Sequence, residues 1–220
     1  MKKTVTFLAA GVLMATAAVL GGCRGTTDPG DFTPDETALI KQALTAEGVS
    51  FPKGTMRVLT IAEHSDSLVL RDTSRSLSRK ALMSEEYDAL CSLMVATVTH
   101  PSQDGVGIAG PQVGINRRIV AVQRFDKEGE PFEVYPNIRI VWASDSLAYG
   151  PEGCLSVPDR RGEVLRSQEI VIEYTDLAAC SASTVVKPMP LARDTVRGFT
   201  AVIFQHEIDH LDGVLYIDRL

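Results

Sequence analysis

The sequence predicts an α+β fold, in which antiparallel β-sheets pack around one helix near the carboxyl end. Two observations carry this prediction. The residues from 199 to 210 are strongly amphipathic and end near Gly213, a residue type that commonly terminates helices. Before them lie several short runs rich in β-branched residues, which are typical of strands: 118–122, 138–142, 169–174 and 184–186.

The first 22 residues are predicted to lie outside this domain. Met1-Lys2-Lys3 gives a positively charged start, residues 4–20 carry no charge, and Leu20-Gly21-Gly22-Cys23 follows. This pattern indicates a secretory signal. Its ending resembles the bacterial lipobox, which implies that Cys23 is acylated and becomes the new amino terminus. An uncleaved membrane anchor is disfavoured, because about 17 apolar residues are few for a membrane span.

The predicted organisation is a lipoprotein signal peptide over 1–22, an acylated tether over 23–35 and one domain over 36–220. The tether is rich in Gly, Thr, Pro and Asp, as flexible linkers are. A chain of 220 residues that is 45% hydrophobic suits one domain with a sizeable core. Removing Lys2 and Lys3 with the signal leaves 20 basic and 28 acidic residues. This formal charge of −8 argues against a nucleic-acid partner. We expect an exported protein, held at a membrane of the bacterial cell envelope.

Other segments of the domain have weaker signals. The composition predicts a short capped helix from residue 33, and a second helix begins after Ser84 with a face of apolar side chains: Tyr87, Leu90, Met94 and Val98. Residues 56–61 suit a strand or an extended segment, and residues 105–114 form a glycine-dense loop. Cys91 is expected to act as a small buried hydrophobe, while Cys180 has no interpretation.

The C-terminal helix carries the candidate chemistry. His206 and His210 are four residues apart, so both rings can reach a single metal ion. Glu207 can approach a metal-bound water without being a ligand. Phe199, Val202 and Ile203 continue the same stripe, which is expected to face the core. A His-Glu-x-x-His pattern also arises by chance, so other parts of the chain must support it.

A catalytic metal site needs a third protein ligand and an open position for water. Cys154, in the turn-forming stretch 152–158, can supply a thiolate. Taken alone, such a cysteine is more often a buried structural thiol.

Three stretches together resemble the three motifs of bacterial peptide deformylases. They are GVGIAGPQ at 105–112, EGCLSVP at 152–158 and QHEIDHLDG at 205–213, in the family's order and at similar separations. Two departures are visible. Ala109-Gly110 stands where the family usually has Ala-Ala, and the missing methyl group is expected to loosen the loop without removing a chemical group. The exported amino terminus is unusual too, since the family normally works on nascent chains in the cytosol.

The resemblance implies the roles of the site residues. Cys154, His206 and His210 hold the metal, natively Fe²⁺, with Zn²⁺, Ni²⁺ or Co²⁺ able to substitute. Glu207 is the catalytic acid and base, and the oxyanion donors are Gln112 and the backbone N–H of Leu155. Gly107 and Gly153 pair with the backbone of the peptide substrate, and Arg161 is a further candidate contact outside the motifs.

The implied reaction is hydrolysis of the N-formyl group of N-formylmethionyl peptides, with release of formate. Two alternatives were weighed. A metallopeptidase of the His-Glu-x-x-His type is disfavoured because Cys154 replaces its usual third His or Glu. A non-catalytic binding lipoprotein is disfavoured because every ligand and catalytic residue is present.

Overall fold

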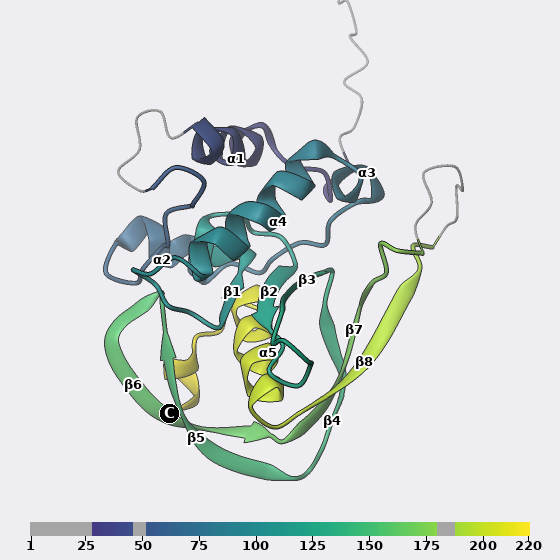
Figure 1. Ribbon diagram of the computed structural model, residues 1–220. Helices are drawn as coiled ribbons and strands as arrows, with labels where there is room; N and C mark the ends of the chain where they lie inside the picture. Colours follow the sequence, from purple (N-terminus) through teal and green to yellow (C-terminus); the bar gives the residue numbers. More distant parts are fainter. Residues whose placement is uncertain (1–27, 46–51, 180–187) are drawn as a thin grey trace, which may run out of the picture.

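The computed structural model describes residues 28–45, 52–179 and 188–220 (Figure 1). The signal peptide, Cys23, Cys180 and the strand predicted at 184–186 lie outside these ranges. None of the described helices is long and apolar enough to cross a membrane.

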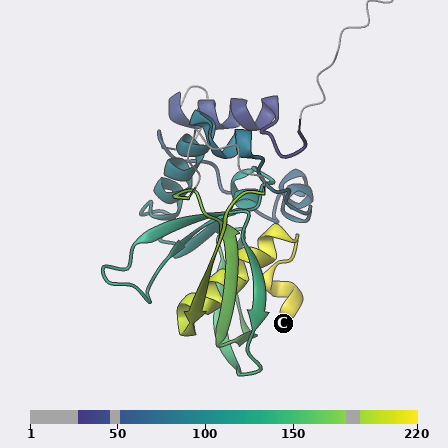
Figure 2. The ribbon, with the colours of Figure 1, turned by 90° about the vertical axis from the view of Figure 1, so that its right-hand side faces the viewer.

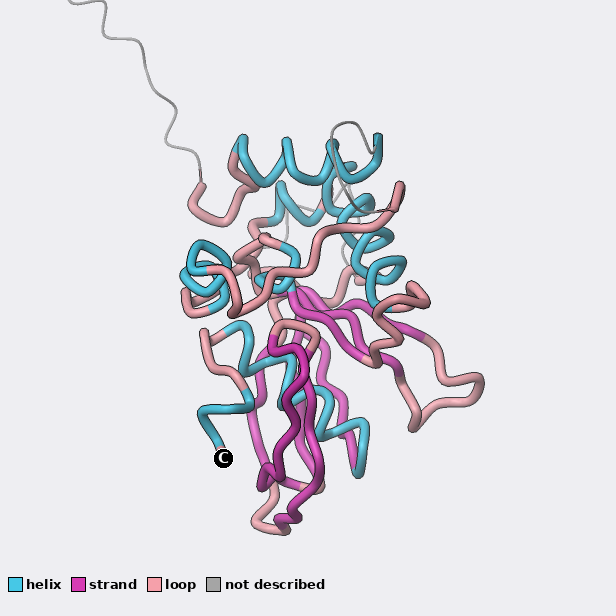
Figure 3. Tube along the Cα trace, turned by 90° about the vertical axis from the view of Figure 1, so that its left-hand side faces the viewer, coloured by secondary structure: helices cyan, strands magenta, loops and turns pink. Residues whose placement is uncertain are grey.

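Four helices gather at one end of the molecule (Figures 1 and 3): α1 (Pro34–Thr45), α2 (His64–Leu70), α3 (Arg79–Leu82) and α4 (Glu85–Val98). The two predicted helices are α1 and α4. Thr33 and Glu36 cap α1 reciprocally: the Thr33 N–H donates to Glu36 Oε2 at 2.7 Å, and the Glu36 N–H donates to Thr33 Oγ1 at 3.2 Å. Ser84 Oγ accepts from the Tyr87 N–H at 3.3 Å, so the predicted cap of α4 is confirmed.

The strands form three antiparallel units. β1 (Gly107–Ala109), β2 (Ile119–Gln123) and β3 (Phe132–Pro136) make one sheet. β4 (Arg139–Ala143), β7 (Glu169–Thr175) and β8 (Leu191–Arg197) make the second, and β5 (Leu147–Cys154) with β6 (Val157–Ser167) makes a long hairpin. Helix α5 (Gly198–Leu211) lies among these strands (Figures 2 and 3). The predicted α+β fold around a C-terminal helix is confirmed.

The sheet β1–β2–β3 separates two hydrophobic clusters. Successive strand residues point to opposite faces, so Ile108, Ile119 and Ala121 join the cluster beneath α1 and α4. The alternate residues Ala109, Val120 and Val122 join the cluster around α5. Burial on both faces explains why β2 reads as a continuous apolar run.

Several elements differ from the predictions. Within the expected loop 105–114, Gly107–Ala109 is a strand and Gly110–Val113 is a 3₁₀ turn. Residues 56–60 belong to no helix or strand, and residue 61 lies in a turn. Strands β3, β5, β6 and β8 were not predicted, because most of their residues are half-buried or exposed and many are charged.

Part of the predicted tether is docked on the domain. The Arg117 guanidinium donates to the carbonyls of Pro29 at 2.8 Å and Asp31 at 2.5 Å, and the Ser78 N–H donates to the Gly30 carbonyl at 2.9 Å. Arg117 also pairs with Glu36 and is buried. A buried guanidinium needs such acceptors, so the described residues before α1 are held rather than loose. Residues 23–27 lie outside the described ranges, and the domain boundary stays a prediction.

Candidate metal centre

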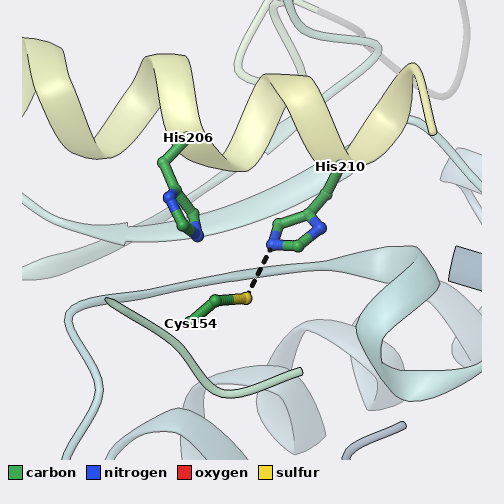
Figure 4. A group of neighbouring side chains, drawn as sticks. All are labelled: Cys154, His206 and His210. Carbon is green, nitrogen blue, oxygen red and sulfur yellow. Dashed lines mark hydrogen bonds between the residues drawn. The ribbon is translucent and has the colours of Figure 1, made fainter. Parts of the chain in front are cut away.

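The three predicted ligands converge at one point (Figure 4). His206 and His210 project from one face of α5, with ring centroids 5.1 Å apart, and Cys154 comes from the end of β5. One nitrogen from each ring and the Cys154 sulfur lie within 4.8 Å of one another, and Cys154 Sγ is 3.2 Å from His210 Nε2. Both histidines are buried.

This arrangement fits a divalent metal ion. In a tetrahedral site with ordinary metal–sulfur and metal–nitrogen bonds, neighbouring ligand atoms are about 3.5 Å apart. One thiolate and two imidazoles suit a borderline-soft cation such as Zn²⁺ or Fe²⁺. Three ligands leave a position open for water or substrate.

Glu207 lies beside this group, and one oxygen of its carboxyl group has no hydrogen-bond partner among the described residues. This oxygen, Oε2, is buried. A Cβ added at Gly107 would approach Glu207 Oε1 to 2.5 Å, so only glycine at 107 leaves room for the carboxyl group. Burial raises the pKa of Glu207 to about 7, with opposing contributions from the charges of His206 and Glu152. A carboxyl group with a pKa near neutrality can both take and give a proton.

The side chain of Gln112 is fixed with its amide nitrogen toward the site. Its Oε1 accepts from the Ala109 N–H at 2.8 Å. Its Nε2 lies 3.6 Å from Cys154 Sγ and 3.3 Å from Ser156 Oγ. This orientation is the one that an oxyanion donor needs.

Close packing of the backbone explains why position 110 is glycine rather than the family's usual alanine. A Cβ at this position would approach the carbonyl oxygens of Ile115 to 2.5 Å and Arg117 to 2.8 Å. The backbone therefore fills the space that a methyl group would need. The Gly110 exchange leaves no gap, and the expectation of a looser loop is not supported.

A second layer of charged groups was missed by the sequence reasoning. His206 Nδ1 is 2.7 Å from Glu152 Oε2, and Arg166 donates to both oxygens of Glu152 at 2.7 and 3.1 Å. Burial opposes ionisation of Glu152, but the bonds from His206 and Arg166 prevail and lower its pKa to about 2. A carboxylate on Nδ1 directs the other ring nitrogen to the metal. Glu152 is part of the second motif, whereas Arg166 has no local signal.

In the metal-free protein the two histidines have pKa values shifted in opposite directions. Burial lowers the pKa of His206, but hydrogen bonds to Cys154 and Glu152 outweigh it and raise the pKa to about 10. Burial and the positive charge of His206 hold the pKa of His210 well below its usual value. Metal binding therefore has to displace a proton from His206.

A cavity of about 820 Å³ opens onto this group. Arg161 lines this cavity. So does every predicted site residue of the three motifs except His210, namely Gly107, Gln112, Gly153, Cys154, Leu155, His206 and Glu207. Phe199 and Val202 line it as well, and Phe199 is 57% exposed. The stripe was expected to face the core, and for Phe199 this is wrong, because the ring forms part of the cavity wall.

Cys91 is free and half-buried, and it packs against the cluster beneath α4, as expected for a small hydrophobe. Burial raises the pKa of its thiol to about 11. It takes no part in the metal centre.

A cysteine and two histidines around one point, with an unpartnered glutamate facing a cavity, define a metal-dependent hydrolase. Residues 58–220 match the family model of polypeptide deformylase, and the chain belongs to this family. It is an enzyme that removes N-formyl groups, as the three motifs implied.

Individual relatives agree. The chain is 36% identical to peptide deformylase 2 of Gloeobacter violaceus over 178 residues, covering 80% of this chain and 87% of that one. It is 43% identical to peptide deformylase 2 of a Nostoc species over 133 residues, 58% and 68% of the two chains. A Met-Ala-Ser-bound crystal structure of a class I type b peptide deformylase from Acinetobacter baumannii superimposes with a TM-score of 0.62 at 31% identity, covering 76% of this chain and 98% of that one.

Proposed function

We propose that this deformylase acts on N-formylmethionyl peptides, and that different residues bind the metal and transfer the protons. Cys154, His206 and His210 hold the metal, and Glu207 moves the protons. The observation that carries the proposal is the buried Glu207 carboxyl group, which lies without a partner beside the ligand triad. An unpaired buried carboxyl group costs stability, and a catalytic role accounts for it.

A bound metal ion lowers the pKa of water from 15.7 to about 7 in favourable sites. Glu207 would accept a proton from the water that attacks the formyl carbon. It then passes the proton to the departing amine, and the products are formate and a free amino terminus. Such proton transfer is typically worth about 10²–10⁴ in rate.

The oxygen of the formyl group gains negative charge during the attack. Gln112 Nε2 and the backbone N–H of Leu155 are the groups we assign to donate hydrogen bonds to it. The bond between Gln112 Oε1 and the Ala109 N–H holds the amide in place before substrate arrives. Loss of one donor of this kind typically costs about 10²–10³.

The cavity accounts for the peptide. We assign the backbones of Gly107 and Gly153, which both line the cavity, to pair with the backbone of the substrate. Phe199, Val202 and Ile203 offer an apolar wall that suits a methionine side chain. The Acinetobacter baumannii relative was solved with Met-Ala-Ser bound, which supports this assignment.

We propose Fe²⁺ as the resident metal, with Zn²⁺, Ni²⁺ or Co²⁺ able to replace it. The mixed thiolate and imidazole donors accept all four ions. The thiolate adds negative charge and weakens the ion as a Lewis acid. The site therefore suits a small formyl carbonyl better than an internal peptide bond.

Formate release from formyl-Met-Ala-Ser tests the mechanism. The chain starting after Cys23 is purified without oxygen and loaded with Fe²⁺, beside a Glu207→Ala variant loaded equally. We expect release by the first protein and a loss of at least about 10²-fold in the second. Equal release by both would remove Glu207 from the mechanism, and no release by either, with metal bound, would favour a binding role.

We further propose that the chain is exported and acylated at Cys23. The charge-free run over 4–20 and the ending Leu20-Gly21-Gly22-Cys23 support this. The test is incorporation of an alkyne-labelled fatty acid into the full chain in a bacterial host, beside Cys23→Ser. Label in the parent only, in the membrane fraction, supports the proposal. An unlabelled parent in the cytosolic fraction would reject it.

A further inference from the structure

The segment η2 (Tyr216–Arg219) contacts both elements that carry the metal ligands. The Tyr216 ring stacks on the His206 ring of α5, with centroids 6.0 Å apart and planes at 22°. On the other side, the Leu220 side chain fills the space next to Gly162 of β6, where a Cβ would lie 2.3 Å from Leu220 Cδ2. The proposed mechanism assigns no role to this segment.

Arg219 joins α5 through a fork. Its Nε donates to Asp209 Oδ2 and its Nη2 to Asp209 Oδ1, both at 2.5 Å. Asp209 precedes His210 directly on α5 and is 9% exposed. Two parallel bonds from a planar guanidinium fix the direction of the carboxylate as well as its position.

Asp209 also belongs to an ionic chain behind the ligands. Arg166 Nη1 donates to Asp209 Oδ2 at 2.6 Å, while the same guanidinium holds Glu152. Glu152 in turn accepts from His206. The order is therefore Arg219, Asp209, Arg166, Glu152 and His206, with alternating charges up to the imidazole. Glu152 and Arg166 belong to the β5–β6 hairpin, which also carries Cys154.

When His206 is neutral, as it must be to bind a metal, the charges along this chain balance with Arg219 present. Asp209 and Glu152 supply two negative charges, and Arg166 with Arg219 supplies two positive charges. Without Arg219, two carboxylates compete for the single buried guanidinium of Arg166, whose side chain is 4% exposed. The Arg219 side chain is 43% exposed, but Asp209 and Arg166 are buried. Loss of Arg219 therefore leaves buried charges poorly paired, and they can relax only by moving.

We infer that Arg219 is a positioning residue of the metal centre. Through Asp209 and Arg166 it holds the β5–β6 hairpin against α5, and thereby keeps Cys154 at the correct distance from His206 and His210. This inference rests on the proposed assignment of the three ligands. Arg219 lines no part of the cavity and touches none of the reacting groups.

The test measures metal affinity rather than turnover. Co²⁺ is titrated into metal-free protein, and its thiolate charge-transfer absorption gives the dissociation constant. We expect Arg219→Ala to weaken Co²⁺ binding about tenfold, at the low end for groups behind a metal ligand. Arg219→Lys keeps the charge but not the fork, so it should also weaken binding, by several-fold.

Arg197→Ala is the matched control. Arg197 makes the same two-bond contact with Glu169, at 2.9 and 2.9 Å, just before the other end of α5, but joins no metal ligand. Its Co²⁺ affinity should equal that of the parent. Parental affinity in both Arg219 variants, with only the melting temperature of the metal-free protein lowered, would overturn the inference. A parent that shows no thiolate absorption would instead reject the ligand assignment itself.

Discussion

The two sides of the β1–β2–β3 sheet bury different kinds of side chain. Beneath α1 and α4 lies a hydrophobic cluster, in which Leu90 and Met94 are fully buried. Around the metal-bearing half of α5 the buried groups include charged and polar ones: Glu152, Arg166, His206, Glu207, Asp209 and His210. Burial of apolar side chains on the first side stabilises the fold, whereas burial of charged groups on the second side has a desolvation penalty that reduces stability. Substitutions on the two sides should therefore have opposite signatures.

Glu207→Gln should give the largest effect on the chemical side. The amide cannot accept a proton from water, so kcat/KM for formyl-Met-Ala-Ser should fall by about 10²–10⁴. The melting temperature should stay the same or rise, because an unpartnered buried carboxyl group is removed. Steady-state kinetics and thermal unfolding measure the two effects. Glu163→Gln, on the exposed face of β6, is the control, and a melting point well below that of the control would contradict the expectation.

Leu90→Ala should show the reverse signature on the helical side. Leu90 is fully buried in α4, and such truncations typically cost about 2–5 kcal/mol of unfolding free energy. Because the sheet lies between Leu90 and the ligands, kcat/KM per folded molecule should remain within about twofold. Denaturant unfolding and kinetics on the metal-loaded protein check this. A tenfold loss of kcat/KM in fully folded protein would show that the two sides are coupled.

Gly110 begins the 3₁₀ turn that directly follows β1, and Gly110→Ala should reduce both stability and catalysis. Its Cβ would press against the carbonyl oxygens of Ile115 and Arg117, and overpacking of this kind typically costs about 1–3 kcal/mol. Since Gly110 opens the turn that carries Gln112, kcat should fall as well. Thermal unfolding and kcat are the measurements. A variant as stable as the parent would show that this backbone can shift freely.

The pH profile should give the smallest effect. Burial holds the pKa of Glu207 near 7 without metal, and the positive charge of a bound cation lowers it. The carboxylate that accepts the proton is lost as pH falls, so kcat/KM should decrease on the acid side of a midpoint at or below about pH 7. Glu163→Gln should keep the same profile. A value of kcat/KM that decreases as the pH rises from 6 to 7.5 would contradict this role.

Much of the chemical side could be predicted from sequence. The spacing of His206, Glu207 and His210 fixes their positions on a helix, and three glycine-containing motifs in order identify the partners. Helices α1 and α4 were predicted because caps and apolar spacing are local signals. The sheet β1–β2–β3 was predicted only at β2, where both faces are buried.

The remainder depends on contacts between distant residues. The β5–β6 hairpin presents Arg160, Arg161 and Glu163 to solvent and buries Arg166, so its sequence lacks the alternation of apolar and polar residues that would reveal a strand. Arg166, Asp209 and Arg219 lie 43 and 10 residues apart along the chain, and nothing in their spacing pairs them. Phe199 reads as a core residue in a helix pattern, although it lines the cavity, because a ligand-facing wall is as apolar as a core.

Because the residues just before α1 are docked on the domain, only a short length of chain separates Cys23 from it. From Cys23 to Asp28 the chain spans at most about 18 Å at full extension. With the lipid that we propose on Cys23, the docked residues would lie within about 18 Å of that lipid, so the domain would work close to a bilayer surface rather than at the end of a long linker.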